Sequence, residues 1–300
     1  MANYSCQRIL DGIDFSHDYL SFLSDILTLI LYLGVLIVLA ASLIIAYSAT
    51  PQELSTPDSY SGNRCHHKID ISELDCNFGA QVNATNKVLL VGDSHAAQHL
   101  WALQELALIL KFELISLTSS GCPSISRDLL GTFNEHCKSR QTQLRKFLSE
   151  QNGVVILISN MAEKRYPQFT EYSDKVVSDG YVRFINDVMP SNKVIVVLDT
   201  PYPNFDVPKC LRLSRSLGEI VNCDIPNTSS SVTRSLERAL MQADIEFLNP
   251  RPILCPKDCK PLTDGKSIYR DESHLSRSGS LLLRDALGKL LREELNTKED

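Results

Sequence analysis

The sequence has no run of lysine or arginine residues, and its formal net charge at neutral pH is -6. Binding to nucleic-acid phosphates needs a concentrated basic surface, so these two features exclude a typical nucleic-acid-binding protein. Internal repeats and low-complexity tracts are also absent. With 300 residues, of which 43% are hydrophobic and 22% charged, the chain can form one sizeable core. A neutral or carbohydrate partner fits this composition better than a polyanion.

One long segment lacks charge altogether. Residues 26–52 contain no Asp, Glu, Lys or Arg, and the part from Ile26 to Tyr47 is almost wholly Leu, Ile, Val and Ala. A helix of this length can cross the hydrocarbon core of a bilayer, so we expect a transmembrane helix over residues 26–48 after a cytoplasmic segment, residues 1–25. The alternatives are a helix buried in a core and a signal peptide cleaved near Ala46. The late start and the length of the run argue against a signal peptide.

The segment that follows, residues 49–62, is rich in Ser, Thr, Pro and acidic side chains. This composition favours a solvated linker over packed structure. The folded domain is therefore expected to occupy residues 63–300.

Cysteine is scarce before the apolar run, where only Cys6 occurs, and the other eight cysteines lie after it. An even number of cysteines at short spacings is typical of disulfides in an oxidising compartment, periplasmic or extracellular. We therefore predict a single-pass protein of the cell membrane with its C-terminal domain outside the cytoplasm. The four predicted disulfides join near neighbours in the sequence: Cys65 with Cys76, Cys122 with Cys137, Cys210 with Cys223, and Cys255 with Cys259.

Zinc is a competing interpretation only for the last of these pairs, Cys255 and Cys259. No second CxxC or HxxxH motif accompanies it, as a structural zinc site would require. Neither a metal nor a cofactor is expected.

Short apolar or β-branched runs alternate with helical patterns after the linker. Strands that are continuously apolar and separated by helices indicate a parallel sheet covered on both faces, that is, a doubly wound α/β domain. In such sheets ligands bind beyond the carboxyl ends of the strands, so residues directly after each apolar run are the first candidates for a site. The predicted strands are residues 87–91, 112–116, 154–159, 194–198 and, more weakly, 245–248, and the last predicted helix is 281–295.

A candidate nucleophile follows the first predicted strand, which runs into Gly92-Asp93-Ser94-His95. A helix then begins at Ala96, so Ser94 is expected at a strand-to-helix turn, where backbone N–H groups could stabilise an oxyanion. The alternative is that Asp and Ser only cap the helix.

A nucleophilic serine needs a base, and the base needs an acid that orients it. The segment Tyr269 to Ser276 contains Asp271 and His274, whose three-residue spacing can place both side chains on one side of a turn. The alternative is that His274 is a surface histidine and that Ser276 caps the last helix. Four other histidines are interpreted as incidental: His66, His67, His99 and His136.

Together these segments resemble the SGNH hydrolase superfamily, which pairs Gly-Asp-Ser with a later Asp-x-x-His. One branch is more similar: the C-terminal SGNH domain of membrane acyltransferases that O-acetylate cell-surface polysaccharides. Ser-Gly-Cys-Pro at residues 120–123 and Val-Pro-Lys-Cys-Leu at residues 207–211 also resemble that branch. The likeness covers about residues 63–295.

The resemblance implies a flavodoxin-like three-layer sandwich with Ser94 as nucleophile, His274 as general base and Asp271 as its orienting partner. It also implies two oxyanion donors, the backbone N–H of Gly121 and the side chain of Asn160. Both have alternatives, since Gly121 could simply form a turn, and the residue after Asn160 departs from the Gly-x-Asn-Asp pattern that the family often shows.

The resemblance further implies O-acyl transfer, most simply of acetyl groups, to an extracytoplasmic polysaccharide through an acyl-serine intermediate. The fused relatives carry a many-helix membrane domain where this sequence has one predicted transmembrane helix. A separate multi-helix membrane acyltransferase is therefore expected to supply the acyl group. The alternatives are a carbohydrate esterase, or deacetylase, with the same Ser-His-Asp site, and an inactive glycan-binding module. The intact Ser94, Asp271 and His274 argue against the inactive module.

Overall fold

A computed structural model describes residues 15–48, 66, 78, 84, 86–217 and 221–295 of the chain, with side chains of the first helix described only over residues 24–40. The chain divides into two compact units, residues 1–49 and residues 50–300. The predicted linker, residues 49–62, lies outside the described residues.

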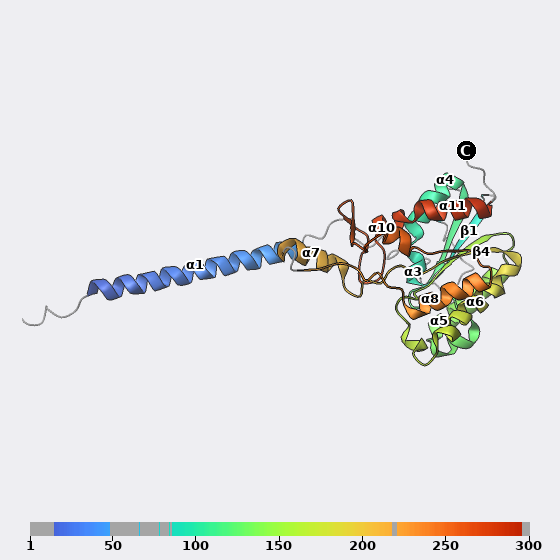
Figure 1. Ribbon diagram of the computed structural model, residues 1–300, viewed down its shortest axis with the longest axis horizontal. Coiled ribbons are helices and arrows are strands. Elements are labelled where there is room, and N and C mark those ends of the chain that lie inside the picture. Colours follow the sequence, from blue (N-terminus) through green and yellow to red (C-terminus); the bar gives the residue numbers. More distant parts are fainter. Residues whose placement is uncertain are drawn as a thin grey trace, which may run out of the picture. The chain divides into compact units, whose positions relative to one another are not determined.

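The described residues of the first unit form the helix α1 (Phe15–Ser48), of 34 residues (Figure 1). Its large apolar side chains from Ile26 to Leu39 are all exposed, from 38% at Ile26 to 70% at Tyr32. Over the described residues, no helix is found to combine the length and the apolar character needed to cross a bilayer. The transmembrane helix predicted for residues 26–48 therefore stays a prediction.

A sheet of five parallel strands forms the centre of the second unit, in the order β2-β1-β3-β4-β5. This order is that of a flavodoxin-like, doubly wound sheet, and it confirms the predicted α/β class. The strands are β1 (Asn86–Gly92), β2 (Phe112–Thr118), β3 (Val155–Ser159), β4 (Lys193–Val197) and β5 (Phe247–Leu248).

Helices cover both faces of this sheet and give the domain three layers (Figure 1). Side chains along β1 alternate between two hydrophobic cores: Leu89 and Val91 pack into one, and Val88 and Leu90 into the other. Because both faces are buried, the strand is apolar at every one of these positions. The first core is covered by α5 (Glu135–Ser149), α6 (Asp174–Val188) and α8 (Ser231–Gln242), and the second by α4 (Leu100–Leu110), α10 (Arg277–Leu282) and α11 (Arg284–Leu295).

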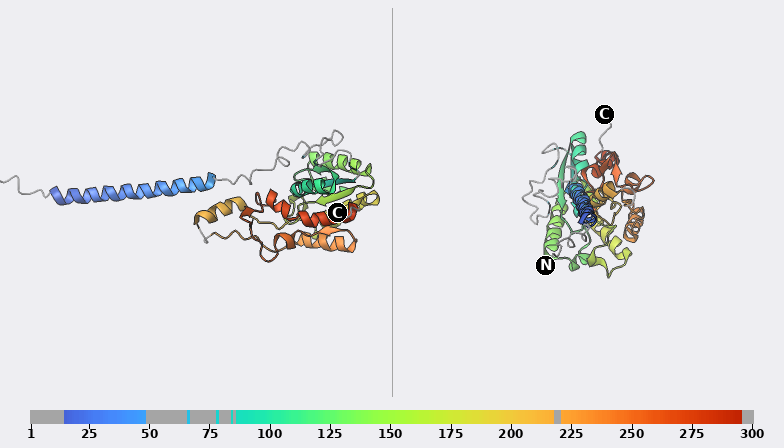
Figure 2. Two further views of the ribbon diagram at one scale, coloured as in Figure 1. Left: turned by 90° about the horizontal axis from the view of Figure 1, so that it is seen from above. Right: turned by 90° about the vertical axis from the view of Figure 1, so that its left-hand side faces the viewer.

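The remaining elements are short and lie mainly at the ends of the strands. Among them, α7 projects from the sandwich (Figure 2). They are α3 (Ser94–Ala97), α7 (Val207–Leu217), α9 (Arg251–Leu254), the 3-10 helices η2 (Arg127–Thr132), η3 (Pro167–Phe169) and η4 (Met189–Ser191), and an antiparallel pair, β6 (Leu262–Thr263) and β7 (Lys266–Ser267).

The helix predicted over residues 281–295 is confirmed for residues 284–295, which form α11, but its start is corrected: the chain breaks at Leu283, and the residues before the break belong to a separate helix, α10. The N–H of Leu283 bonds to the carbonyl of Ser280, three residues back, at 3.1 Å. This tighter turn ends the first helix before the second begins.

Three of the four predicted disulfides are present: Cys122–Cys137, Cys210–Cys223 and Cys255–Cys259. The fourth predicted pair, Cys65 and Cys76, lies outside the described residues. The bond between Cys255 and Cys259 leaves neither sulfur as a thiolate ligand, which argues against the zinc alternative.

Candidate active site

The turn between β1 and α3 places Ser94 at the carboxyl edge of the sheet. Gly92 ends the strand with φ +144°, and a Cβ atom at this position would lie 1.8 Å from the carbonyl oxygen of Ser159 on the neighbouring strand. Glycine is therefore required for the close approach of β1 and β3. Asp93 caps α3 by accepting the N–H of His95 at 2.7 Å. The capping role thus belongs to Asp93, and the hydroxyl of Ser94 remains available for other contacts.

The Asp93 carboxylate is buried and also holds the segment that follows β3. It accepts the N–H of Met161 at 2.8 Å and the phenol O–H of Tyr166. These contacts fix the turn that carries Ser94 to a second loop of the same sheet edge.

Ser94, His274 and Asp271 come together in one hydrogen-bonded chain, although 180 residues separate the serine from the histidine. The Nε2 atom of His274 lies 2.9 Å from Ser94 Oγ. Its Nδ1 atom lies 2.8 Å from Asp271 Oδ2 and 3.0 Å from Oδ1. With the proton on Nδ1 donated to Asp271, Nε2 is the acceptor that faces the serine O–H.

The loop carrying this pair is held by its own backbone and by α3. Asp271 Oδ1 accepts the N–H groups of Ser273, at 2.8 Å, and of His274, at 2.7 Å. The side-chain oxygen of Gln98, at the end of α3, accepts the N–H of Leu275 at 2.8 Å. The loop is therefore anchored to the helix that begins with Ser94.

The surroundings keep the base neutral and its partner ionised. Burial lowers the pKa of His274, and the positive charges of His95 and Arg270 lower it further. The hydrogen bond and charge of Asp271 raise it, but the pKa remains below its ordinary value. Burial alone would raise the pKa of Asp271, but the hydrogen bond and charge of His274 and two backbone N–H groups hold it well below its usual range. Near neutral pH, His274 can accept a proton from Ser94.

The two predicted oxyanion donors follow the strands on either side of β1. Gly92 pairs with Thr118 at the end of β2 and with Ser159 at the end of β3. Gly121 lies three residues after Thr118, in an exposed turn with φ +67°. Asn160 directly follows Ser159. Both predicted donors thus lie at the sheet edge that carries Ser94, and their role as donors stays a prediction.

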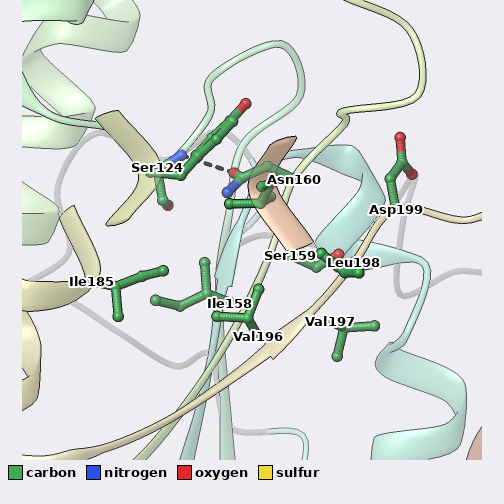
Figure 3. Close-up of a pocket in the computed structure, with 11 residues that line it drawn as sticks. Ser124, Ile158, Ser159, Asn160, Ile185, Val196, Val197, Leu198 and Asp199 are labelled. Carbon is green, nitrogen blue, oxygen red and sulfur yellow. Dashed lines mark hydrogen bonds between the residues drawn. The ribbon is translucent and has the colours of Figure 1, made fainter. Parts of the chain in front are cut away.

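The side chain of Asn160 is buried and already makes one hydrogen bond, in which its Oδ1 accepts the N–H of Ser124 at 2.8 Å. This bond leaves the Nδ2 group as the donor that an oxyanion would need. Asn160 also lines a cavity of about 10 Å³, whose other lining residues are mainly apolar, such as Ile158, Ile185 and Leu236 (Figure 3). This volume holds at most a single water molecule, so the cavity is no binding site for an acyl group.

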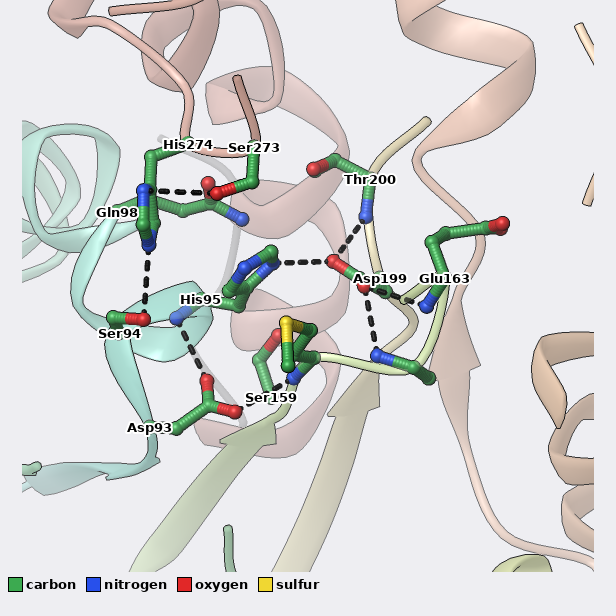
Figure 4. Close-up of polar contacts among 12 residues, drawn as sticks. Asp93, Ser94, His95, Gln98, Ser159, Glu163, Asp199, Thr200, Ser273 and His274 are labelled. Carbon is green, nitrogen blue, oxygen red and sulfur yellow. Dashed lines mark hydrogen bonds and ion pairs between the residues drawn. The ribbon is translucent and has the colours of Figure 1, made fainter. Parts of the chain in front are cut away.

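A second Asp–His pair, which the sequence did not predict, lies beside the first (Figure 4). His95 Nδ1 lies 2.6 Å from Asp199 Oδ1, and both side chains are almost fully buried. The ring of His95 also packs against the ring of His274, with 4.8 Å between centroids. The sequence did place both residues at the expected edge of the sheet, because Asp199 follows the fourth predicted strand and His95 directly follows Ser94. It did not indicate that they contact each other.

Two of the histidines interpreted as incidental are buried near this edge. The ring of His66 lies within 2.9 Å of Thr118 Oγ1 and 2.8 Å of Ser120 Oγ, in the turn that leads to Gly121. His99 precedes α4, where its Nε2 lies 3.4 Å from Ser159 Oγ. His66 therefore contacts the segment that carries one predicted oxyanion donor.

The parallel sheet and the match to a family model together identify an SGNH-type acyltransferase or esterase domain. The chain belongs to the family described as "SGNH domain (fused to AT3 domains)", whose model matches residues 64–289. No curated protein sequence matches the chain.

Solved structures that are similar to the chain include the following two. The periplasmic domain of a lipopolysaccharide acetyltransferase from Salmonella Paratyphi A superposes with a TM-score of 0.59 at 16% identity, covering 80% of this chain and 99% of that one. A Bacillus subtilis protein gives a TM-score of 0.40 at 14% identity, covering 72% of this chain and 56% of that one. At this identity, the first likeness supports the same fold.

Proposed function

We propose that the chain is an O-acyltransferase that moves acyl groups, acetyl in the simplest case, onto hydroxyl groups of an extracytoplasmic polysaccharide. The observation that carries this proposal is the hydrogen-bonded chain from Ser94 through His274 to Asp271. A serine hydroxyl held 2.9 Å from a neutral imidazole is the arrangement that acyl transfer through a covalent intermediate requires.

In the first step, Ser94 Oγ attacks the carbonyl carbon of the acyl donor while its proton passes to His274 Nε2. The bond between the acyl carbon and the leaving atom of the donor then breaks, and His274 returns the proton to that leaving group. In the second step, an acceptor hydroxyl loses its proton to His274 and attacks the acyl carbon, and Ser94 regains a proton as its ester bond breaks. Asp271 holds the ring in the required tautomer throughout.

The negative charge that develops on the carbonyl oxygen needs donors at the carboxyl edge of the sheet. We assign this role to the Gly121 N–H and to Asn160 Nδ2, because they follow the strands that flank β1. Preorganised donors of this kind supply much of the rate enhancement in acyl transfer.

We place the folded domain outside the cytoplasm and α1 in a bilayer as a single-pass anchor over residues 26–48. The three disulfides of the described residues support an oxidising compartment, and the exposed apolar side chains of α1 support a lipid environment. The family description, which names fusion to AT3 domains, supports a multi-helix membrane acyltransferase as the source of the acyl group. The structural neighbour is itself a lipopolysaccharide acetyltransferase domain, which supports a glycan acceptor.

Hydrolysis is the second candidate, because water can reach the same site. The side chain of His274 is 17% exposed and that of Asp271 is 39% exposed. If water replaces the acceptor in the second step, the protein is a carbohydrate esterase with the same catalytic serine.

The decisive experiment measures acetate release from an activated aryl acetate by the purified full-length chain. We expect slow turnover and an acetyl group on Ser94, detectable by mass spectrometry of the quenched protein. Ser94→Ala should abolish both, whereas Ser149→Ala, a change on the surface of α5, should leave both intact. Unchanged hydrolysis by the Ser94→Ala protein would refute the proposal.

A second arm separates transfer from hydrolysis. When soluble oligosaccharides are added at constant ester concentration, a transferase forms acetylated sugar at the expense of free acetate. Acetate release that no sugar changes would favour the esterase.

A further inference from the structure

The second Asp–His pair has the environment of a buried ion pair. The side chains of His95 and Asp199 are 3% and 0% exposed, and their closest atoms, Nδ1 and Oδ1, are 2.6 Å apart. A histidine so deeply buried remains protonated only when a carboxylate that is itself well stabilised lies against it.

Asp199 is stabilised as a carboxylate by three backbone N–H groups in addition to His95. Its Oδ2 accepts from Ala162 at 2.7 Å and from Glu163 at 2.8 Å, and its Oδ1 accepts from Thr200 at 2.8 Å. Hydrogen bonds to the charged form of a carboxylate favour ionisation, and they offset the desolvation that burial imposes. The negative charge that His95 needs is therefore fixed by the loops after β3 and β4.

Three aspartates act on the charge of His95: one follows β1, one follows β4, and one lies in the loop before α10. Burial alone would lower the pKa of His95, but the charge and hydrogen bond of Asp199, together with the charges of the aspartates at 93 and 271, raise it to about 9. Besides His274, a further histidine lies close to His95: His99, at the start of α4, has a pKa lowered to about 3 by burial and by His95, so it is neutral near pH 7.

The positive charge of this pair lies directly against the proposed general base. The rings of His95 and His274 contact each other with centroids 4.8 Å apart and planes inclined by 50°. A protonated His274 would thus face a second imidazolium at contact distance, and this repulsion disfavours protonation of His274 before substrate arrives.

We propose that His95 is a positioning residue for the acyl-transfer reaction: paired with Asp199, it holds a buried positive charge against His274 and keeps that ring ready to accept the Ser94 proton. The inference rests on the proposed function and extends it. The second pair extends the working range of the enzyme toward acidic pH, because the base stays unprotonated there.

The first test reads the charge directly and needs no activity. In the full-length wild-type chain with ¹⁵N-labelled histidine, NMR should show both ring N–H groups of His95 through neutral pH, with loss of one near pH 9. The ring of His274 should titrate below its ordinary value. A His95 ring that becomes neutral at or below pH 6.5 overturns the proposal.

The second test follows the acid limb of kcat/KM for aryl acetate cleavage. In His95→Gln the limb should move to higher pH by roughly half a unit or more, because a unit charge at this distance is worth at least that much even in water. Asp199→Asn should move it less, because loss of the countercharge also neutralises His95. His99→Gln is the matched control: it removes a buried imidazole that carries no charge, and the limb should stay in place.

A merely structural role would lower kcat in these variants without moving the limb, and that result would also overturn the proposal. If the wild-type chain proves inactive, the proposed function fails, yet the inference remains testable. The titration of the His274 ring by NMR in wild type and in His95→Gln then decides it. If His95→Gln does not fold, the wild-type titration of His95 decides.

Discussion

Two aspartate–histidine pairs lie side by side at the carboxyl edge of the sheet, and the same two residue types behave in opposite ways. In Asp271–His274 the residues are three positions apart and partly exposed, and the histidine pKa is lowered. In Asp199–His95 they are 104 positions apart and buried, and the histidine pKa is raised to about 9.

Contact with a carboxylate therefore does not by itself determine whether a histidine is charged. Each ring loses hydration, but only His95 has a counterion, Asp199, that is fully buried and bonded to three backbone N–H groups. His274 has a more solvated partner and two neighbouring cations, His95 and Arg270. One pair is thus suited to hold a charge and the other to move a proton.

The largest expected difference between the pairs is in activity. His274→Ala should reduce kcat for aryl ester cleavage on the order of 10⁵-fold to 10⁶-fold, as for Ser94→Ala, because nucleophile and base act as a unit. Asp271→Asn should cost less, roughly 10⁴-fold, because orientation is only part of the function of the base. Steady-state kinetics with circular dichroism as a folding control checks this. Near-normal rates in His274→Ala would remove the proton-transfer role from the first pair.

For stability we expect the opposite ranking of the two pairs, with the larger loss at Asp199–His95. Asp199→Asn breaks a buried ion pair, since His95 then becomes neutral, and removes the carboxylate that accepts three backbone N–H groups; it should lower the free energy of unfolding by about 3–5 kcal/mol. Asp271→Asn removes a partly exposed carboxylate and should cost only about 1 kcal/mol. Urea unfolding of both proteins measures the difference. Equal costs would mean that the two pairs are not distinguished by burial.

A third prediction concerns the pH dependence of stability. The pKa of His95 is about 9 in the folded state against 6.5 for the unperturbed side chain. Its contribution is therefore fully present below pH 6.5 and is lost as the pH rises through about 9, with a total of roughly 3 kcal/mol. Unfolding curves of the wild type should show this loss between pH 6.5 and 9, and those of His95→Gln should not. A wild-type profile that matches the variant would contradict the charged state.

The smallest effect is expected outside both pairs. Asn160→Asp keeps the oxygen that accepts the Ser124 N–H but removes the Nδ2 donor, so it should lower kcat about 10²-fold if Asn160 stabilises the oxyanion. An unchanged kcat would assign Asn160 to the loop structure alone.

Much of the fold was predictable because the strands are buried on both faces. Their apolar runs mark β1 to β4 within one or two residues, whereas β5, with only two residues, gave a weak pattern. The break at Leu283 was not predictable from periodicity, since leucines continue through it and a single tightened hydrogen bond makes the turn.

The site was predictable where it depends on local sequence. Asp271 and His274 share one turn, and Ser94 follows a strand, so the motif and the sheet topology are enough to predict these three residues. The partnership of His95 with Asp199 depends on how the loops after β3 and β4 pack, and no spacing in the chain encodes that contact. The same holds for Gln98, whose side chain binds a backbone N–H 177 residues away.

Gly92 has a genetic consequence. Any replacement would place a Cβ atom 1.8 Å from the Ser159 carbonyl, and must push the strand out of place. A screen for loss of the proposed glycan modification should therefore recover missense alleles at codon 92 as well as at codons 94 and 274. Alleles at codon 92 would be recognised by low protein abundance. Alleles at codons 94 and 274 would be recognised by normal abundance of an inactive protein.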